Sequence, residues 1–311
     1  MFSCRLLALI AAFVLSSTLA VTQQRSVAIT FDDLPFAGRH VQAANAAEAL
    51  AVNKAILDTL AQHHASATGF VIQKSVQRLG NAGTTILRTW VKRGYDLGNH
   101  GYSHADFNKL TVAAMEEEII DGEGDAKTLM TAAGRRYRYF RFPMNHTGDT
   151  NEKHDQIAAF LAGRGYKVAA CTIDNSDYIF NDAYVTMLAK HDMLAAGRLR
   201  REYLSYTAAE IDYYAGLNRQ ALGYDPPQIM LLHDSPLNAA VLDDLLRLFE
   251  RENYRFLALD DALADPAYTT PDTFVSKYGP MWGYRWAAER HVAVNGKLEP
   301  EPPAWIANYP R

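Results

Sequence analysis

The sequence predicts an α/β protein, a distorted (β/α) barrel of about seven parallel strands. Two features of the chain lead to this prediction. Short apolar runs alternate with longer segments whose apolar residues recur at helical spacing, and polar clusters follow the apolar runs. Repeated strand-then-helix units favour parallel strands joined by right-handed crossovers. Because folds of this kind commonly form one unit, we expect one main domain with appendages.

The individual elements follow from the same periodicity. The predicted strands are short, apolar and bounded by polar or breaker residues, and they span 26–30, 68–72, a stretch ending at 97, 138–142, 167–173, 229–232 and 255–259. The predicted helices have apolar residues three and four positions apart, and they span 43–63, 84–92, 112–133, 157–163 and 241–250. The alternation places these elements in one catalytic domain at 26–265.

Two segments do not fit the simple alternation. Residues 179–228 predict a long, mostly helical insertion within the domain, and residues 266–311 predict a C-terminal extension. Aromatic side chains at their spacings are more typical of core packing than of sugar-binding platforms: Tyr203, Tyr206, Tyr213, Tyr214, Trp282 and Trp286. We therefore expect these aromatic residues to be part of the core, and we do not count them in the site.

The N-terminus has the order of a secretory signal. Arg5 precedes an apolar run at 6–15, and small residues then lead to a plausible cleavage after Ala20. The run is shorter than the roughly 20 residues that a spanning helix needs, which leaves a retained anchor as the weaker alternative. We expect residues 1–20 to be a signal peptide, the protein to be periplasmic or secreted, and no membrane span to remain after cleavage.

Composition and cysteine content restrict the class of protein further. Hydrophobic residues make up 49% of the chain, which supports a sizeable core, and 31 basic with 35 acidic side chains give a net charge of −4. Intermixed charges of this balance argue against a nucleic-acid partner. Of the two cysteines, Cys4 would leave with the signal, so the mature protein forms no internal disulfide and Cys171 is expected to be a small buried side chain.

Polar clusters follow several of the predicted strands. Because the carboxyl ends of parallel strands line one face of a barrel, side chains from separate clusters are expected to converge there. The clusters are Asp32-Asp33, His100-Gly101-Tyr102-Ser103-His104, Arg141-Phe142-Pro143, Asp174-Asn175-Ser176-Asp177 and His233-Asp234.

The second cluster has the spacing of a metal site. His100 and His104, four residues apart, can present both imidazoles on one side of a turn, and one carboxylate completes the three-ligand set of an open catalytic zinc site. Asp32-Asp33 is the obvious source of that carboxylate. Adjacent aspartates on a strand point in different directions, so one can bind metal while the other faces the reacting atom. Taken alone, the two histidines would more simply be a capped, solvated turn.

A three-ligand metal leaves positions open for water and a substrate carbonyl, which makes hydrolysis plausible. Asp32 suits the base that takes the proton from water, and His233 suits the acid that protonates the leaving group. Arg141 could keep Asp32 ionised, and Asp174 could keep His233 protonated by the same reasoning with the signs exchanged. The plainer alternatives are a surface ion pair for Arg141 and a helix N-cap for Asp174.

The set of motifs resembles the polysaccharide deacetylase family, also described as NodB-homology domains or family-four carbohydrate esterases. The resemblance covers about residues 26–265 in the family's order, through Thr30-Phe31-Asp32-Asp33, Asn99-His100-Gly101-Tyr102-Ser103-His104, Arg141-Phe142-Pro143, Asp174-Asn175-Ser176-Asp177-Tyr178 and Leu231-Leu232-His233. It implies a distorted barrel with Asp32 as catalytic base, Asp33, His100 and His104 as metal ligands, and His233 as catalytic acid.

Three departures from the family pattern bear on substrate choice. Met144 follows Pro143 where the family often has tyrosine, although its backbone N–H can still serve as an oxyanion donor. Tyr178 replaces a frequent tryptophan. The insertion at 179–228 could narrow the groove. We expect Pro143, Met144 and Tyr178 to contact substrate.

These observations lead to one principal functional hypothesis and two alternatives. The principal hypothesis is hydrolysis of N-acetyl groups on a glycan that contains N-acetylglucosamine, of the peptidoglycan or chitooligosaccharide type. It needs one divalent metal ion, zinc in the first instance, with cobalt, nickel or manganese compatible with the same ligands. The alternatives are an O-acetyl esterase acting on xylan and a catalytically silent glycan-binding domain. Glycan identity, chain length and oligomeric state stay open.

Overall fold

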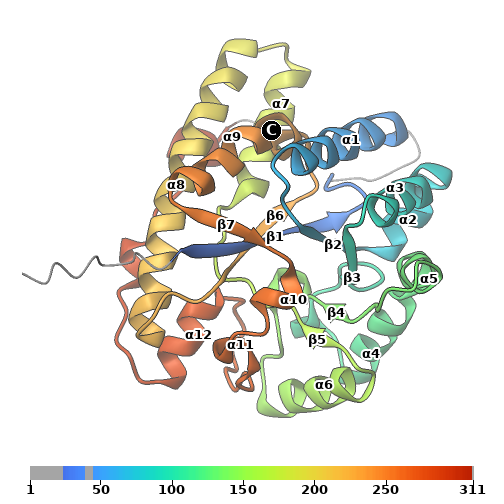
Figure 1. Ribbon diagram of the computed structural model, residues 1–311, viewed down its shortest axis with the longest axis vertical. Coiled ribbons are helices and arrows are strands. Elements are labelled where there is room, and N and C mark those ends of the chain that lie inside the picture. The colour runs from blue at the N-terminus through green and yellow to red at the C-terminus, as the bar shows by residue number, and fades with distance from the viewer. Residues whose placement is uncertain (1–23, 39–44, 310–311) are drawn as a thin grey trace, which may run out of the picture.

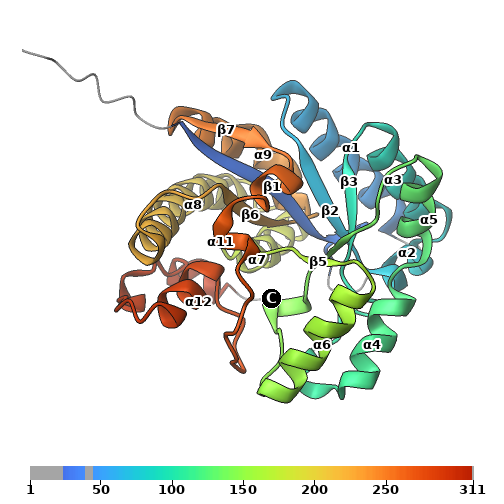
Figure 2. The same ribbon diagram turned by 60° about the horizontal axis from the view of Figure 1, so that its bottom comes forward.

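The computed structural model describes residues 24–38 and 45–309 of the chain. The predicted signal peptide at 1–20 lies outside the described residues. Figure 1 shows a central sheet with helices around it, and Figure 2 shows the sheet curling, so that its two ends approach each other. The curled parallel sheet confirms the predicted fold class.

The sheet contains seven parallel strands in the order β5-β4-β3-β2-β1-β6, with β7 also paired to β1. Their bounds are β1 Arg25–Leu34, β2 Ala67–Val71, β3 Asp96–Asn99, β4 Tyr139–Phe140, β5 Lys167–Val168, β6 Gln228–His233 and β7 Tyr254–Leu257. β1 is the central strand, because β7 pairs with its first half, β2 with its second half and β6 with most of its length. The register of β1 and β6 sets Asp32 beside His233.

The strand predicted at 167–173 is regular only over Lys167–Val168. Beyond it, Ile173 forms a bridge to Met230 of β6, so this irregular segment leads from one end of the curled sheet to the other. Its backbone carbonyls accept hydrogen bonds from outside a strand ladder: Ala169 and Ala170 from the Arg141 side chain, and Cys171 from the backbone of Trp282. These bonds replace the ladder that the sequence predicted.

Helices follow most strands and cover the outside of the sheet. They are α1 Ala46–Gln62, α2 Gln73–Leu79, α3 Asn81–Lys92, α4 Val112–Asp121, α5 Gly124–Ala132, α6 Asn151–Gly163, α7 Asp177–Ala189, α8 Met193–Leu222, α9 Pro236–Arg251 and α10 Leu259–Ala262. The helix predicted at 112–133 is therefore two helices. The break falls at Gly122, where a Cβ atom would lie 2.5 Å from Asn99 Oδ1, so the chain passes too close to β3 to carry a side chain there.

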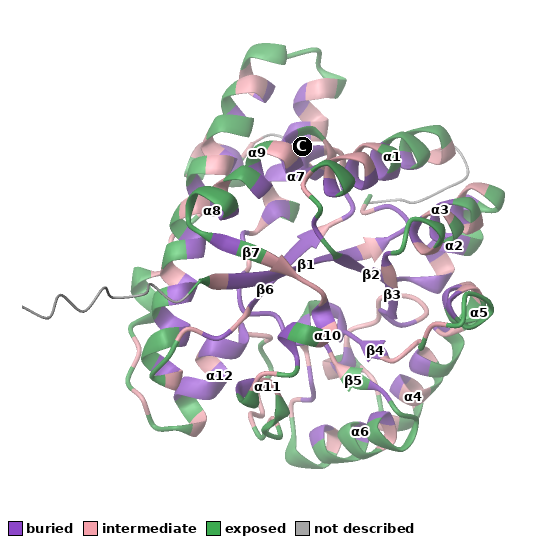
Figure 3. Ribbon diagram, in the orientation of Figure 1, coloured by how far each residue is buried: buried purple, intermediate pink, exposed green. Residues whose placement is uncertain are grey.

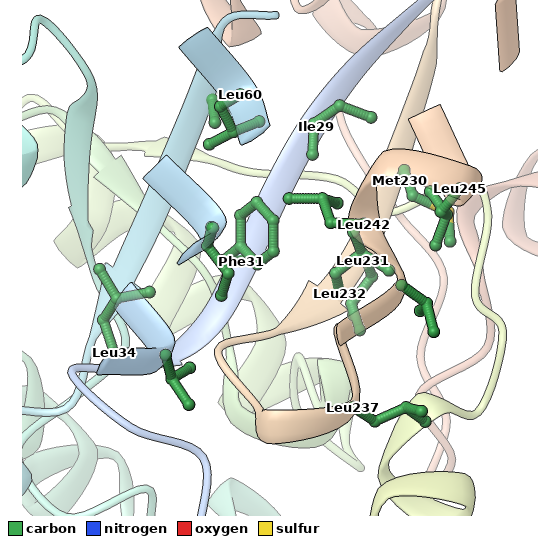
Figure 4. Close-up of a cluster of buried hydrophobic side chains, with 14 of the residues drawn as sticks. Ile29, Phe31, Leu34, Leu60, Met230, Leu231, Leu232, Leu237, Leu242 and Leu245 are labelled. Carbon is green, nitrogen blue, oxygen red and sulfur yellow. The ribbon is translucent and has the colours of Figure 1, made fainter. Parts of the chain in front are cut away.

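The main core lies between the sheet and its helices. Figure 3 shows buried residues along the strands and exposed residues on the outer helix faces. In the close-up of Figure 4, Phe31 of β1 lies among Leu60 of α1, Leu232 of β6 and Leu242 of α9. Phe31 is fully buried and meets the Trp90 ring edge-on at 5.8 Å. Apolar side chains thus fix β1 in position immediately before Asp32.

The insertion and the extension both pack on the barrel. α7 and α8 form the insertion, and the extension contains α11 Pro266–Thr269, α12 Trp282–Glu289 and α13 Ala304–Ala307. Trp282 and Trp286 of α12 are buried, and α12 packs along α8. Tyr203, Tyr206 and Tyr214 of α8 are buried as well, which confirms the expectation of core packing for these aromatic residues.

Among the described residues, none of the helices is both long and apolar enough to cross a membrane. The division into a catalytic domain at 26–265 and an extension stays a prediction.

Candidate active site

The predicted polar clusters meet on one face of the sheet. Asp32 and Asp33 lie near the end of β1, His100 follows β3 directly, Arg141 follows β4 directly, and His233 is the last residue of β6. This is the face expected for groups at the carboxyl ends of parallel strands.

Three of these side chains form a possible metal site. One ligand atom each from Asp33, His100 and His104 lies within 4.8 Å of the other two. Asp33 Oδ1 is 3.6 Å from His100 Nε2 and 3.5 Å from His104 Nε2. Asp33 and His104 both have left-handed backbone conformations, with φ of 63° and 61°, and the cost of such conformations is typical of functional positions.

The donor set of this site fits a divalent cation. Asp33 Oδ1 is buried and has no hydrogen-bond partner among the described residues, which is costly for a carboxylate oxygen unless a ligand satisfies it. The Nδ1 atom of His100 donates to the Arg141 carbonyl oxygen at 2.9 Å, which fixes the ring and leaves Nε2 on the side of Asp33. Burial lowers the pKa of His100, which favours the neutral imidazole that binds metal.

The loop from His100 to His104 is held by Glu118 of α4. The two carboxylate oxygens of Glu118 accept hydrogen bonds from the Ser103 backbone N–H at 2.8 Å and from the Ser103 hydroxyl at 2.7 Å. Asn99 Oδ1 accepts from the Gly101 N–H at 2.8 Å. Backbone and side-chain bonds therefore fix the loop that carries both imidazoles.

Asp32 lies beside the metal site and is paired with Arg141. Asp32 Oδ1 accepts from Arg141 Nη1 at 2.7 Å, and both side chains are buried. Burial raises the pKa of Asp32, but the charges of Arg141, His100 and His233 outweigh it and hold that pKa below its usual value. The same Arg141 nitrogen donates to Thr30 Oγ1 at 2.7 Å. The predicted contact between Arg141 and Asp32 is present, and it keeps this carboxylate ionised.

The carboxylate partner of His233 is Asp177. His233 Nδ1 donates to Asp177 Oδ1 at 2.6 Å, and the backbone N–H of His233 donates to Asp177 Oδ2 at 2.7 Å. Burial lowers the pKa of His233, but the charge and hydrogen bond of Asp177 outweigh it and raise that pKa to about 10. The ring is therefore an imidazolium at neutral pH.

The prediction that Asp174 pairs with His233 is wrong. Asp174 Oδ1 accepts from the Ser176 backbone N–H at 3.0 Å and so closes a turn before α7. Burial raises the pKa of Asp174 to about 6, whereas the hydrogen bonds to His233 come from Asp177. Asp177 is the first residue of α7, where the helix dipole favours a carboxylate, and the turn at Ser176 aims it at β6.

A cavity of about 430 Å³ adjoins the metal site. Its lining includes Asp33, His233, Tyr178 and Phe36. Tyr178 is 55% exposed, and its ring centre lies 6.2 Å from that of His233. Tyr178 therefore lies at this cavity beside His233, and its contact with substrate stays a prediction.

Pro143 and Met144 are not among the residues that line this cavity. They lie in the short turn Pro143–Asn145 after Arg141, where Pro143 is buried and Met144 is 43% exposed. Their contact with substrate stays a prediction.

Sequence reasoning missed a set of residues that support the pair of His233 and Asp177. Asn238 of α9 donates to Asp177 Oδ2 at 2.5 Å, and Tyr203 of α8 donates to Asn238 Oδ1 at 2.8 Å. Asn175 completes the chain by donating to the Tyr203 hydroxyl at 2.7 Å. The sequence signal for Asp177 was its place in the polar cluster just before the predicted helical insertion at 179–228. Tyr203 and Asn238 carry no local signal because they come from distant helices.

Fold and site together define a curled parallel α/β protein with an Asp-His-His triad flanked by a buried Asp-Arg pair and a His-Asp pair. The sequence profile of the family described as Polysaccharide deacetylase matches residues 20–163. The predicted resemblance to this family is therefore confirmed over that part of the chain.

Deacetylases from other organisms are similar in sequence to this chain. The chain is 26% identical over 163 residues to a chitin deacetylase from Pestalotiopsis sp., covering 52% of this chain and 47% of that protein. It is 22% identical over 243 residues to the peptidoglycan-N-acetylglucosamine deacetylase PgdA of Listeria monocytogenes, covering 78% of this chain and 39% of that protein. The aligned segments thus span less than half of these relatives.

A solved structure of a CE4 family pseudoenzyme from Bacillus anthracis matches the fold, with a TM-score of 0.51 and 14% identity over 77% of this chain and 66% of that chain. The likeness extends through most of the described fold. It is a likeness of fold alone.

Proposed function

We propose that this protein is a metal-dependent deacetylase that hydrolyses N-acetyl groups on a glycan containing N-acetylglucosamine. The observation that carries the proposal is the convergence of a metal triad, an ionised Asp32 and a protonated His233 on one face of the sheet. A glycan-binding domain would need neither the base nor the acid.

The base side of the mechanism rests on Asp32. A divalent cation bound by Asp33, His100 and His104 would activate water and polarise the acetyl carbonyl. Asp32 Oδ1 is engaged by Arg141, and Asp32 Oδ2 lies 3.6 Å from His100 Nε2, facing the triad. Asp32 therefore accepts the proton of the attacking water while Arg141 keeps it ionised between turnovers.

The acid side rests on His233. Its Nδ1 is bonded to Asp177, so the proton available to substrate is the one on Nε2. His233 donates this proton to the leaving nitrogen of the sugar, and Asp177 stabilises the imidazolium before the transfer. The Met144 N–H supplies a neutral donor for the negative oxygen of the tetrahedral intermediate.

The preference for an N-acetyl substrate is supported by the names of related proteins, which include peptidoglycan-N-acetylglucosamine and chitin deacetylases. A bifunctional xylanase/deacetylase from Pseudobutyrivibrio xylanivorans also matches, at 27% identity over 128 residues, and favours the second candidate, an O-acetyl xylan esterase. The two reactions differ in the leaving group, an amine or an alkoxide, so the same residues could serve either.

Zinc is our proposal for the metal, because two imidazoles and one carboxylate form the usual ligand set of an open catalytic zinc site. Cobalt, nickel and manganese suit the same donors, and availability would decide among them.

The test is acetate release from acetylated chitooligosaccharides, peptidoglycan fragments and acetylated xylan by the purified protein. Activity should vanish with a chelator and return with zinc. Faster release from the N-acetyl substrates supports the proposal, and release from xylan alone supports the esterase. Tight glycan binding without acetate release under any of the four metals would show a silent binding domain.

We also propose export to the periplasm or the medium, on the basis of residues 1–20. Mass spectrometry of the protein from an expressing cell should give a chain beginning at Val21. An uncleaved N-terminus on a protein retained in the membrane would contradict this proposal and support an anchor.

A further inference from the structure

The turn Pro143–Asn145 has an unusual backbone. Met144 and Asn145 both have left-handed conformations, with φ of 57° and 54°, although neither is glycine. Two consecutive non-glycine residues of this kind are strained and persist only where surrounding contacts hold them. The turn begins two residues after Arg141, so its shape bears directly on the catalytic face.

The first contact that holds this turn comes from the C-terminal extension. A Cβ atom on Gly279 would lie 1.9 Å from the Met144 carbonyl oxygen and 2.9 Å from the Asn145 carbonyl carbon. Only glycine leaves room for so close an approach. The extension therefore presses against the peptide bond between Met144 and Asn145, whose atoms are backbone and cannot swing aside.

The second contact is Arg285 of α12. Its side chain is 1% exposed, and its Nη2 donates to the Asn145 carbonyl oxygen at 2.8 Å. Nη1 donates to Thr147 Oγ1 at 2.9 Å and to Asp272 Oδ2 at 2.7 Å. The guanidinium also lies 4.2 Å from the centre of the Trp282 ring. Because these partners fix the planar guanidinium of Arg285, its hydrogen bond also fixes the orientation of the Asn145 carbonyl group.

We propose that Gly279 and Arg285 are positioning residues for the deacetylation reaction, because they fix the turn that presents the Met144 N–H to the substrate. This inference rests on the proposed function. The C-terminal extension would then contribute to the active site by contacting the backbone carbonyl groups of Met144 and Asn145. It would do so although it supplies none of the metal ligands proposed above.

A loosened turn should affect the transition state more than the bound substrate. The negative oxygen develops only as water attacks, so a misplaced N–H donor costs stabilisation at that stage. The metal ligands come from β1 and from the loop after β3, which Glu118 holds independently. Metal binding and substrate affinity should therefore persist when the turn is disturbed.

The experiment compares Gly279→Ala and Arg285→Gln with a matched control, Gly163→Ala, where a new Cβ meets no atom within 4 Å. We expect both test variants to lower kcat on the order of tenfold to a hundredfold, with KM within about twofold and unchanged zinc content. Arg285→Lys, which keeps one cationic donor, should recover part of kcat. Gly163→Ala should match the natural protein.

A second measurement removes the dependence on activity. Amide hydrogen exchange of the 143–147 peptide in the metal-free protein should be faster in both test variants, while exchange in β1 and β6 stays unchanged. Gly279→Ala keeps the buried arginine, so it tests the idea even if Arg285→Gln fails to fold. Natural kcat or natural exchange in folded Gly279→Ala would overturn the inference.

The two proposals fail in distinguishable ways. If the natural protein releases no acetate from any substrate, the deacetylase function fails, and the exchange experiment still tests whether the extension fixes the turn. If acetate is released but kcat is the same in Gly279→Ala and Gly163→Ala, only the positioning role fails.

Discussion

Asp33 contributes an oxygen that is buried and has no partner among the described residues, and two imidazole nitrogens lie within 3.6 Å of it. Such an arrangement is unfavourable without a cation, because burial removes the carboxylate oxygen from water and no hydrogen-bond donor replaces the water. We therefore expect Asp33, His100 and His104 to bind a metal ion together, and the loss of any one of these ligands to weaken the binding.

We predict that Asp33→Ala and His104→Ala each lower zinc affinity by about a hundredfold or more, since each removes one of three ligands. Calorimetric titration with zinc, and metal analysis of the purified protein, measure the effect. His64→Ala is the control, because His64 is an exposed imidazole at the end of α1. Natural zinc affinity in either triad variant would contradict the assignment of the metal site.

The pair of His233 and Asp177 leads to a prediction about pH. The pKa of His233 is raised to about 10, so its acid form, and any rate that needs it, should persist at neutral pH and fall as pH rises through about 10. Asp177→Asn removes the counter-charge, and the alkaline limb should then move toward the ordinary histidine range near pH 6.5. A pH–rate profile, or titration of the His233 ring by NMR, measures the shift.

Asp174→Asn is the matched comparison for this prediction. It removes a carboxylate that closes a turn and leaves the bond between Asp177 and His233 in place. Its alkaline limb should stay close to that of the natural protein. A large shift in Asp174→Asn with none in Asp177→Asn would restore the pairing that the sequence suggested.

The chemistry at single positions was largely predictable from sequence. Asp32, His100, His104 and His233 are residue types that bind metal or move protons, and strand ends are where a barrel collects them. The partner of His233 was not predictable, because Asp174 and Asp177 both follow the same strand. Only the left-handed turn at Ser176, which local composition does not determine, decides which carboxylate points toward β6.

At the scale of elements, α9 joins the sheet to the insertion. Its buried side chains pack beside β1 and β6, as Figure 4 shows for Leu242 and Leu245. The same helix carries Asn238, which bonds to Asp177. Packing of α9 therefore supports the acid side of the site as well as the core.

We predict that Leu245→Ala lowers the free energy of unfolding by about 2–5 kcal/mol, since Leu245 is fully buried and the cavity cannot close completely. Urea denaturation measures the change. Asp244→Ala on the exposed side of α9 should stay within about 0.5 kcal/mol of the natural protein. Equal effects of the two substitutions would show that α9 does not pack as described.

Strand positions were predicted well where apolar runs are long, and poorly at the β5 end of the sheet. The run Val168-Ala169-Ala170-Cys171 has strand composition, yet its carbonyls bond to Arg141 and Trp282. Local propensity could not reveal this, because the competing donors come from β4's loop and from the extension. The same reason explains why one predicted helix at 112–133 breaks at Gly122, against Asn99.

At the scale of the whole molecule, the extension shares the core of the barrel. Met281 and Ile306 belong to the main apolar cluster, and Trp282 and Trp286 pack with Phe70 of β2 in a second one. The sequence predicted that these aromatic residues would be buried, but not that the extension would contact the turn Pro143–Asn145.

We predict that a chain ending at residue 265 loses cooperative unfolding. Removing the extension would expose the apolar core surface that it covers, and this loss is large compared with a typical free energy of unfolding of about 5–15 kcal/mol. Circular dichroism on heating and limited proteolysis measure this. The control is Leu298→Ala in the full chain, where Leu298 is 69% exposed. A compact, cooperatively unfolding fragment would instead support an independent domain at 26–265.

Arg141 has one more consequence. Besides its bond to Asp32, it donates from Nε to the Ala169 carbonyl and from Nη2 to the Ala170 carbonyl, at 3.3 Å each. A single guanidinium thus binds the Asp32 carboxylate and holds the irregular segment that leads from β5 to the bridge between Ile173 and Met230. Replacing Arg141 would therefore release the Asp32 carboxylate and both backbone carbonyls together, whereas a change at the exposed Tyr178 would leave all three bonds in place.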